Sequence, residues 1–248
     1  METQSGIKAS RALETGRGLA WIREGFALFM AMPLAWIINT ILFLLIMIVL
    51  GLIPFVSLLG TIISPVFFAG IMLGCRSLEE GGELAVSHLF AGFGDRGWDL
   101  VKAGLLYLGL ILGVTFIMFL VLGAFGLAAS IGGAEAATPQ LSLGMLVVIF
   151  VATLATIPVV MGFMFSPALL IFNPGLGVVD AYKSSFLACL KNILPFTVFG
   201  LLVIVLSFLA MIPLFLGLLV FIPTMFGATY VAYMDMFGDE VATGEALP

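Results

Sequence analysis

Ionisable residues are scarce in this sequence of 248 residues, and their scarcity excludes most classes of soluble protein. Charged residues make up 9% of the chain, whereas a soluble domain carries about 25%. Hydrophobic residues reach 62%, and the mean hydropathy is +1.29. The apolar runs are unbroken, which excludes an outer-membrane barrel, because barrel strands alternate apolar and polar residues. We therefore expect an all-α, polytopic membrane helical bundle.

Metal-binding and nucleophilic residues are also few. His88 is the single histidine, and Cys75 and Cys189 are the only cysteines. Zinc, haem and di-iron sites have too few ligands to draw on, and two cysteines make no disulfide framework. Proton relays and ion-coupled carriers use ionisable residues at depth, and none falls in the middle of a predicted span. We predict no enzyme activity, no catalytic residue, no metal site and no cofactor.

Stretches without charge locate the spans. No Asp, Glu, Lys or Arg occurs in 25–75 or 192–234, and Glu135 is the only charge between Lys102 and Asp180. Since a span needs about 20 apolar residues, each stretch holds two spans joined by a turn, and the loop-like GGAEAATPQ around Glu135 separates two more. The predicted spans are approximately 34–54, 56–75, 101–128, 142–172, 195–213 and 215–236.

All nine basic residues fall on one side of this six-span arrangement. They are Lys8, Arg11, Arg17, Arg23, Arg76, Arg96, Lys102, Lys183 and Lys191. By the positive-inside rule this side is cytoplasmic, so we expect a multi-pass protein of the bacterial inner (cytoplasmic) membrane with both termini cytoplasmic. One membrane domain, 18–238, follows a flexible cytoplasmic tail, 1–17, and precedes a disordered acidic tail, 239–248.

A proline pair recurs three times, in IPFVSLLGTIISP (53–65), IPVVMGFMFSP (157–167) and IPLFLGLLVFIP (212–223). We interpret the recurrence as three parallel hairpin repeats, at about 18–80, 84–176 and 178–238. A short amphipathic helix in the cytoplasmic interface precedes each hairpin, although glycines interrupt the middle one. The candidate interfacial anchors are Trp21, Phe26, Trp36, Tyr182 and Phe186.

The second proline of each pair, Pro65, Pro167 or Pro223, falls inside the second span of its hairpin. Proline within a helix frees one carbonyl and bends the helix. Because a freed carbonyl in lipid needs protein or water nearby, we expect the three kinks to face the bundle interior. A serine beside the proline can bind the freed carbonyl or line a polar route. The candidate polar interior residues are Asn39, Thr61, Ser64, Ser166 and Thr224.

Several segments carry a resemblance to known proteins: GLAWIREGFALFMAMPLAWI, SHLFAGF, FSPALLIF and YVAYMDMFGD. Through them the chain resembles a family of uncharacterised six-span inner-membrane proteins of proteobacteria. More remotely, it is similar to the membrane domain of some bacterial glycerophosphodiester phosphodiesterases. The resemblance covers roughly residues 18–238 and implies a stand-alone helical bundle in the bacterial cytoplasmic membrane. It carries over no catalytic or binding residue.

Two functions remain open. The first is a non-enzymatic, lipid- or partner-binding accessory or membrane-organising factor. The alternative is a small-molecule or lipid transporter or channel, with a proline-kinked pathway along a pseudo-threefold axis. Expected partners are membrane lipids, and other membrane proteins or further copies of the chain, but not nucleic acid. A water-accessible cavity lined by Thr61, Ser166 and Thr224 would favour transport, and a dry core with grooves open to lipid would favour binding.

Overall fold

The computed structural model describes residue 6 and residues 8–53, 56–131 and 143–238. These residues form helices and no strand in the described part of the chain, which confirms the all-α prediction. The elements are α1 (Arg17–Ala31), α2 (Pro33–Leu52), α3 (Val56–Glu79), the 3-10 helix η1 (Val86–Phe93), α4 (Gly97–Ile131), α5 (Leu143–Met164), α6 (Ser166–Phe172), α7 (Val178–Lys191), α8 (Ile193–Met211) and α9 (Leu218–Phe237).

Six helical segments of the described chain are long and apolar enough to cross a membrane. They are Pro33–Leu52, Val56–Glu79, Gly97–Ala124, Leu146–Phe172, Ile193–Met211 and Leu218–Phe237. Their positions agree with the predicted spans to within several residues. The fourth is broken at Phe165, which divides it into α5 and α6. Pro54 and the predicted GGAEAATPQ turn lie outside the described residues, as does the acidic tail.

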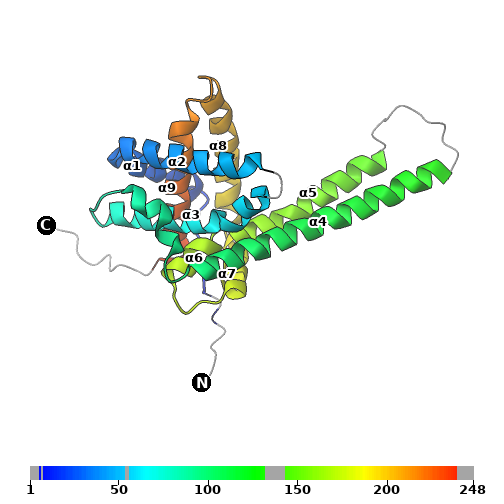
Figure 1. The fold of residues 1–248 in the computed structure, drawn as a ribbon, viewed down its shortest axis with the longest axis horizontal. Helices are drawn as coiled ribbons and strands as arrows, with labels where there is room; N and C mark the ends of the chain where they lie inside the picture. The colour runs from blue at the N-terminus through cyan, green and yellow to red at the C-terminus, as the bar shows by residue number, and fades with distance from the viewer. Residues whose placement is uncertain (1–5, 7, 54–55, 132–142, 239–248) are drawn as a thin grey trace.

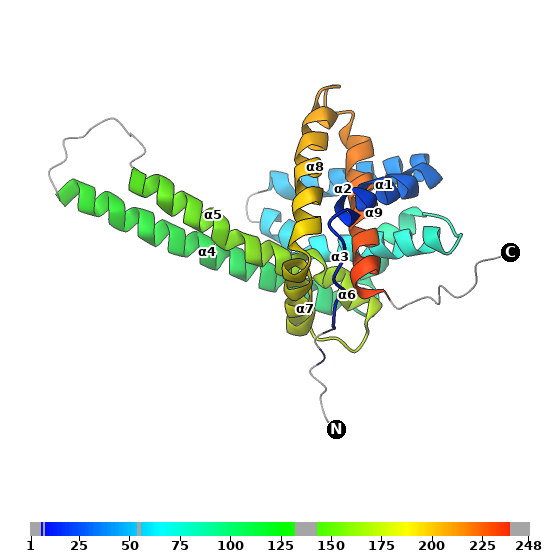
Figure 2. The same ribbon diagram turned by 180° about the vertical axis from the view of Figure 1, so that it is seen from behind.

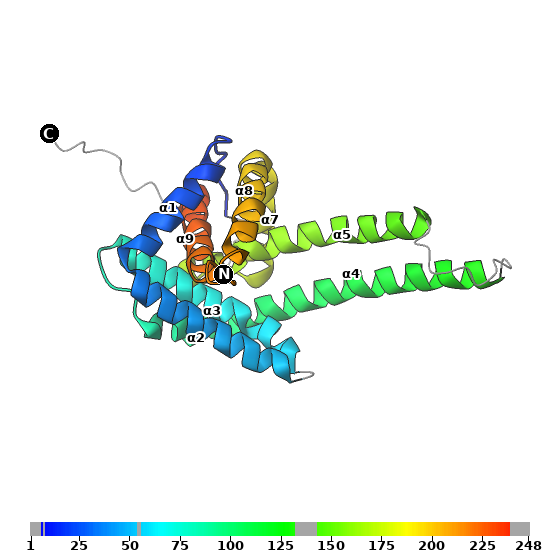
Figure 3. The same cartoon turned by 90° about the horizontal axis from the view of Figure 1, so that it is seen from above.

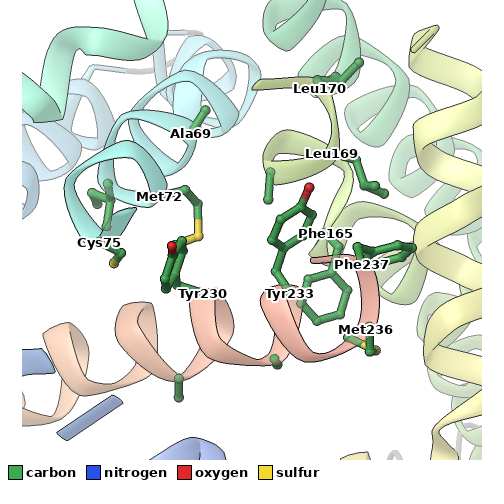
Figure 4. Close-up of a cluster of buried hydrophobic side chains, with 14 of the residues drawn as sticks. Ala69, Met72, Cys75, Phe165, Leu169, Leu170, Tyr230, Tyr233, Met236 and Phe237 are labelled. Atoms are coloured by element: carbon green, nitrogen blue, oxygen red, sulfur yellow. The ribbon is translucent and has the colours of Figure 1, made fainter. Parts of the chain in front are cut away.

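The helices meet in a packed centre, which we call the hub. It comprises the second halves of α3 and α9, residues 65–79 and 223–237, with α1, η1 and α6 packed around them and α7 packed against α6. In Figure 4, Met72 of α3 faces Tyr230 of α9, and Phe165 lies beside Phe237. All four side chains are buried. The hub therefore joins segments from the beginning, middle and end of the chain.

Each second span passes from exposed to buried near a proline. In α3 the buried residues begin at Pro65, with Gly60 as the one exception, and in α9 they begin at Pro223. Pro167 stands at the start of α6, whose first five residues are all buried. Beyond Pro65 and Pro223, towards the start of α3 and of α9, the apolar side chains are exposed or partly buried. The prolines thus lie where α3, α6 and α9 enter the hub.

The helix pairs α2–α3, α4–α5 and α8–α9 leave the hub in different directions. In Figure 1, α8 and α9 stand upright, while the long pair α4 and α5 runs to the right. Figure 2 shows the same arrangement from behind, and Figure 3 shows from above that α2 and α3 diverge from α4 and α5. The described ends of the chain, residues 8–16 and the end of α9, lie away from the far ends of α4 and α5 (Figure 1).

Residues 8–13, predicted as part of a flexible tail, are instead bound to the hub. The Arg11 N–H donates to Met236 O at 3.0 Å, and the Leu13 N–H donates to Asn192 Oδ1 at 2.8 Å. Asn192 Nδ2 donates in turn to Arg11 O at 2.9 Å. Because Asn192 is buried, its amide needs such partners. An extended segment has no periodic pattern, so the sequence did not reveal this attachment.

Candidate functional site

The predicted serine–carbonyl contacts beside two prolines are present. Ser64 Oγ donates to Thr61 O at 3.0 Å, and Ser166 Oγ donates to Phe163 O at 3.1 Å. These carbonyls lie four residues before Pro65 and Pro167, where proline removes the usual N–H partner. Pro65 lies inside α3, whereas Pro167 occupies the first turn of α6, where proline is tolerated. The serines therefore have a local structural role.

Two further polar interior candidates, Asn39 and Thr224, bind carbonyls of their own helices. Asn39 Nδ2 donates to Ala35 O at 2.9 Å, and Thr224 Oγ1 donates to Val220 O at 2.7 Å. Asn39, Ser166 and Thr224 are buried, and Thr61 and Ser64 are partly buried. None of these five lines any of the four cavities described below. The structure does not gather them around a shared polar route.

Three candidate interfacial anchors are enclosed by protein, so their prediction as lipid contacts was wrong. Trp21 Nε1 donates to Asp235 Oδ2 at 2.7 Å, and Trp36 Nε1 donates to Leu28 O at 3.0 Å. The Tyr182 hydroxyl donates to Val159 O at 2.9 Å. All three rings are buried. Their polar atoms find partners inside the protein, which an interfacial ring would otherwise find in water or headgroups.

The other two anchor candidates lie nearer the surface. Phe26 is 44% exposed on α1, and Phe186 is half-buried on α7. Helical spacing identified the apolar face of each amphipathic segment. It could not say whether that face meets lipid or another helix.

A polar network that the sequence did not predict connects α1 to the end of α9. Arg17 Nη2 lies 2.6 Å from Asp235 Oδ2, and Arg17 Nη1 lies 2.9 Å from Glu24 Oε1. Partial burial lowers the pKa of Arg17, but the hydrogen bonds with Asp235 and Glu24 outweigh burial and raise the pKa above its usual value. Asp235 is the first charged residue after the long uncharged stretch 192–234, and that position could have drawn attention to it.

A second contact of this kind joins α9 to α3, where the Tyr230 hydroxyl donates to the Glu79 carboxylate. Around it, three neighbouring cavities of about 390, 550 and 490 Å³ share lining residues. Glu79 and Met234 line the first two, and Lys8 and Asn173 line the last two. Lys8 Nζ donates to Asn173 Oδ1 at 2.8 Å. These cavities therefore lie over a hub surface whose charges are largely paired.

A fourth cavity differs in character, because only apolar residues line it. It is a groove of about 250 Å³ between α4 and α5, outside the hub. Its lining residues are Val114, Ile117, Met118, Val121, Val147, Val148, Val151, Ala152 and Ala155. In the most apolar part of α4, no residue is buried. This helix pair, which we call the α4–α5 arm (residues 105–124 and 146–160), exposes most of its apolar side chains.

The groups with reactive chemistry are held in unreactive settings. Burial raises the pKa of the Cys189 thiol to about 12, and its Sγ lies 3.6 Å from Met161 O. His88 Nδ1 accepts a hydrogen bond from the Ala85 N–H at 3.0 Å, within the first turn of η1. Among the described residues, no group of three His, Cys, Asp or Glu side chains is placed to hold a metal ion.

Comparison with known proteins gives the family. The chain is 31% identical over 194 residues to a probable inner membrane protein of Burkholderia thailandensis strain E264, an alignment covering 75% of this chain and 71% of that protein. The chain belongs to this family of inner membrane proteins. The six membrane-capable helical segments found among its described residues agree with that membership. No family model matches this inner membrane protein, and no solved structure matches it.

Proposed function

We propose that this inner membrane protein is a non-enzymatic lipid-binding factor that organises the membrane around it. The observation that carries the proposal is the apolar groove of about 250 Å³ on the α4–α5 arm. Exposed apolar surface costs roughly 25 cal/mol per Å² in water, so the arm requires lipid or protein around it. A groove without partner atoms also loses dispersion energy. Acyl chains are flexible, apolar and abundant beside a span, and they fit such a groove.

The proposal that the protein is not an enzyme rests on its residue inventory. His88 is the single histidine and is used in a local turn. Both cysteines are buried. The hydroxyls of Ser64, Ser166 and Thr224 bind backbone carbonyls three or four residues earlier in the chain, which favours lipid binding over a polar transport pathway.

We infer a cytoplasmic location for the hub and both termini. All nine basic residues belong to the hub, to the segments bound to it or to the ends of helices next to it, as the positive-inside rule requires of a cytoplasmic side. Fusion of alkaline phosphatase or a fluorescent protein to either end tests this orientation. Phosphatase activity from a terminal fusion would contradict it.

We further propose that the chain consists of three like-oriented units, because the same contact recurs between them. α1 packs against α9, η1 packs against α3, and α7 packs against α5. We call α1, η1 and α7 the leading segments of the three units. η1 and α7 each dock on the second span of the preceding unit, and α1 docks on the second span of the third unit. At two of these contacts the backbones approach closely: Gly25 of α1 lies against the backbone of α9, and Gly92 of η1 lies against the backbone of α3. At the third contact, the Tyr182 ring of α7 covers Gly162 of α5. This cyclic order is the packing expected of three repeats around one axis.

Native mass spectrometry tests the lipid-binding proposal directly. The protein purified in a mild detergent should carry phospholipid adducts. Ala152→Leu and Ala155→Leu, which fill the groove, should reduce them. Ala124→Leu is the matched control, because Ala124 is exposed on the same arm and outside the groove. A protein that retains no lipid, or a second protein chain in place of lipid, would overturn the proposal.

A further inference from the structure

The outer faces of α1 and α7 carry the same pattern at positions 160 residues apart. The matched pairs are Leu19 with Val179, Arg23 with Lys183, Phe26 with Phe186, and Met30 with Leu190. The apolar members at both ends are exposed, by 48% and 55% for the first pair and by 55% and 50% for the last. Each helix therefore presents an apolar stripe with one cation near its middle.

The inner faces match as well, which supports the equivalence of the two helices. Trp21 and Ala181 are both buried, and so are Gly25 and Ser185, and Phe29 and Cys189. The exposed stripes are therefore the faces that remain once equivalent faces have packed against the hub.

The two cations in the stripes differ from the other basic residues of the chain. Seven of the nine have a carboxylate, carbonyl or amide oxygen as a partner: Lys8, Arg11, Arg17, Arg76, Arg96, Lys102 and Lys191. Arg23 and Lys183 are exposed and have no hydrogen bond or ion pair within the described residues. The unpaired cations are thus a matched pair on matched helices.

We propose that Arg23 and Lys183, each framed by its apolar stripe, bind the phosphate of anionic phospholipids in the cytoplasmic leaflet. α1 is followed at once by the span beginning at Pro33, and α7 by the span beginning at Ile193, which keeps both stripes beside the bilayer. Apolar side chains of such helices enter the boundary between headgroups and acyl chains. The long arginine and lysine side chains then extend to the headgroups, and cytoplasmic anionic lipids attract them.

The third leading segment gives an internal contrast. η1 exposes Val86, Phe90 and Phe93, but no cation stands between them. The nearest, Arg96, donates to Pro174 O and Leu176 O at 2.6 Å each. Headgroup recognition is therefore assigned to α1 and α7 alone.

The inference rests on the proposed lipid binding and adds a headgroup preference to it. The test titrates the full chain in detergent with phosphatidylglycerol and with phosphatidylcholine of the same acyl chains, read by native mass spectrometry. The wild type should bind phosphatidylglycerol more tightly. In R23Q/K183Q, the loss of each cation should reduce the ratio of the affinities for phosphatidylglycerol and phosphatidylcholine about fivefold. The affinity for phosphatidylcholine should stay unchanged. Inorganic phosphate should compete no better than chloride at equal ionic strength.

The matched control is R76Q/K102Q, which removes the same net charge from cations that already have carboxylate partners. It should retain the preference, and thermal unfolding checks that both variants fold. An equal loss of headgroup preference in the two double variants would overturn the assignment. Lipid binding by the wild type without any headgroup preference would also overturn the assignment, but it would leave the proposed lipid binding intact. The assignment would also be overturned if the wild type carried a bound protein chain that R23Q/K183Q no longer binds. Binding of neither lipid by the wild type would overturn the proposed function itself.

Discussion

Replacing Gly25 with alanine tests how closely α1 must approach α9. A Cβ at Gly25 would stand 2.6 Å from Thr224 O and 2.8 Å from Ala228 Cα. Both are backbone atoms of α9, so no side chain can rotate away. The helices must separate by about 1 Å, which forfeits up to about half of the dispersion energy of each contacting atom pair. The affected contacts include the buried ring of Trp21, which lies one turn earlier on α1.

The expected magnitude combines two opposing effects. Overpacking of this kind costs about 3 kcal/mol, and exchange of glycine for alanine inside a helix returns about 1 kcal/mol. We expect Gly25→Ala to lower the free energy of unfolding by about 2 kcal/mol. Gly109→Ala is the matched control, because a Cβ there meets no atom within 4 Å, so the variant should gain up to about 1 kcal/mol.

Unfolding by SDS in mixed micelles, followed by tryptophan fluorescence, measures both variants. Trp21 and Trp36 are buried and will report separation of the packed helices. If Gly25→Ala is as stable as Gly109→Ala, the close contact between α1 and α9 does not exist in the membrane protein. The cyclic packing that we propose for the three units would then lose its closing contact.

Three further predictions test the site. Asp235→Asn removes the ion pair with Arg17 and should lower the free energy of unfolding by about 1 to 2 kcal/mol in the same assay; an unchanged value would contradict the network. Ser166→Ala should cost about 1 kcal/mol, whereas Ser207→Ala, whose hydroxyl binds a carbonyl not freed by proline, should cost less; equal costs would refute the serine's role beside proline. Cys189, with its pKa raised by burial to about 12, should resist maleimide at pH 8 while folded and react more as the pH rises towards 12; fast labelling of the folded protein at pH 8 would show that the thiol is accessible.

The spans were predictable because their signal is local and energetic. A run without charge that is long enough to cross a bilayer has one stable location, so the predicted 34–54 corresponds to Pro33–Leu52 in the structure. The serine contacts were also predictable, because Ser64 and Ser166 lie three residues after the carbonyls that they bind. Sequence separation as short as one helical turn fixes such geometry.

The buried environment of the tryptophans was not predictable by the same means. Trp21 lies on an amphipathic segment with the composition of an interfacial helix, yet it binds Asp235, which is 214 positions away. The contact between Glu79 and Tyr230 spans 151 positions. Periodicity identifies residues that share a face, but only the complete fold determines which helix covers that face.

The cyclic packing that we propose accounts for the contact between α1 and α9. If each leading segment docks on the second span of the preceding unit, η1 and α7 find their partners in segments that come earlier in the chain. α1, in the first of the three proposed units, packs against α9 in the third. Arg17 with Asp235, and the Arg11 N–H with Met236 O, fasten this closure. The hub is therefore incomplete until α9 has been made, although the other two contacts can form earlier.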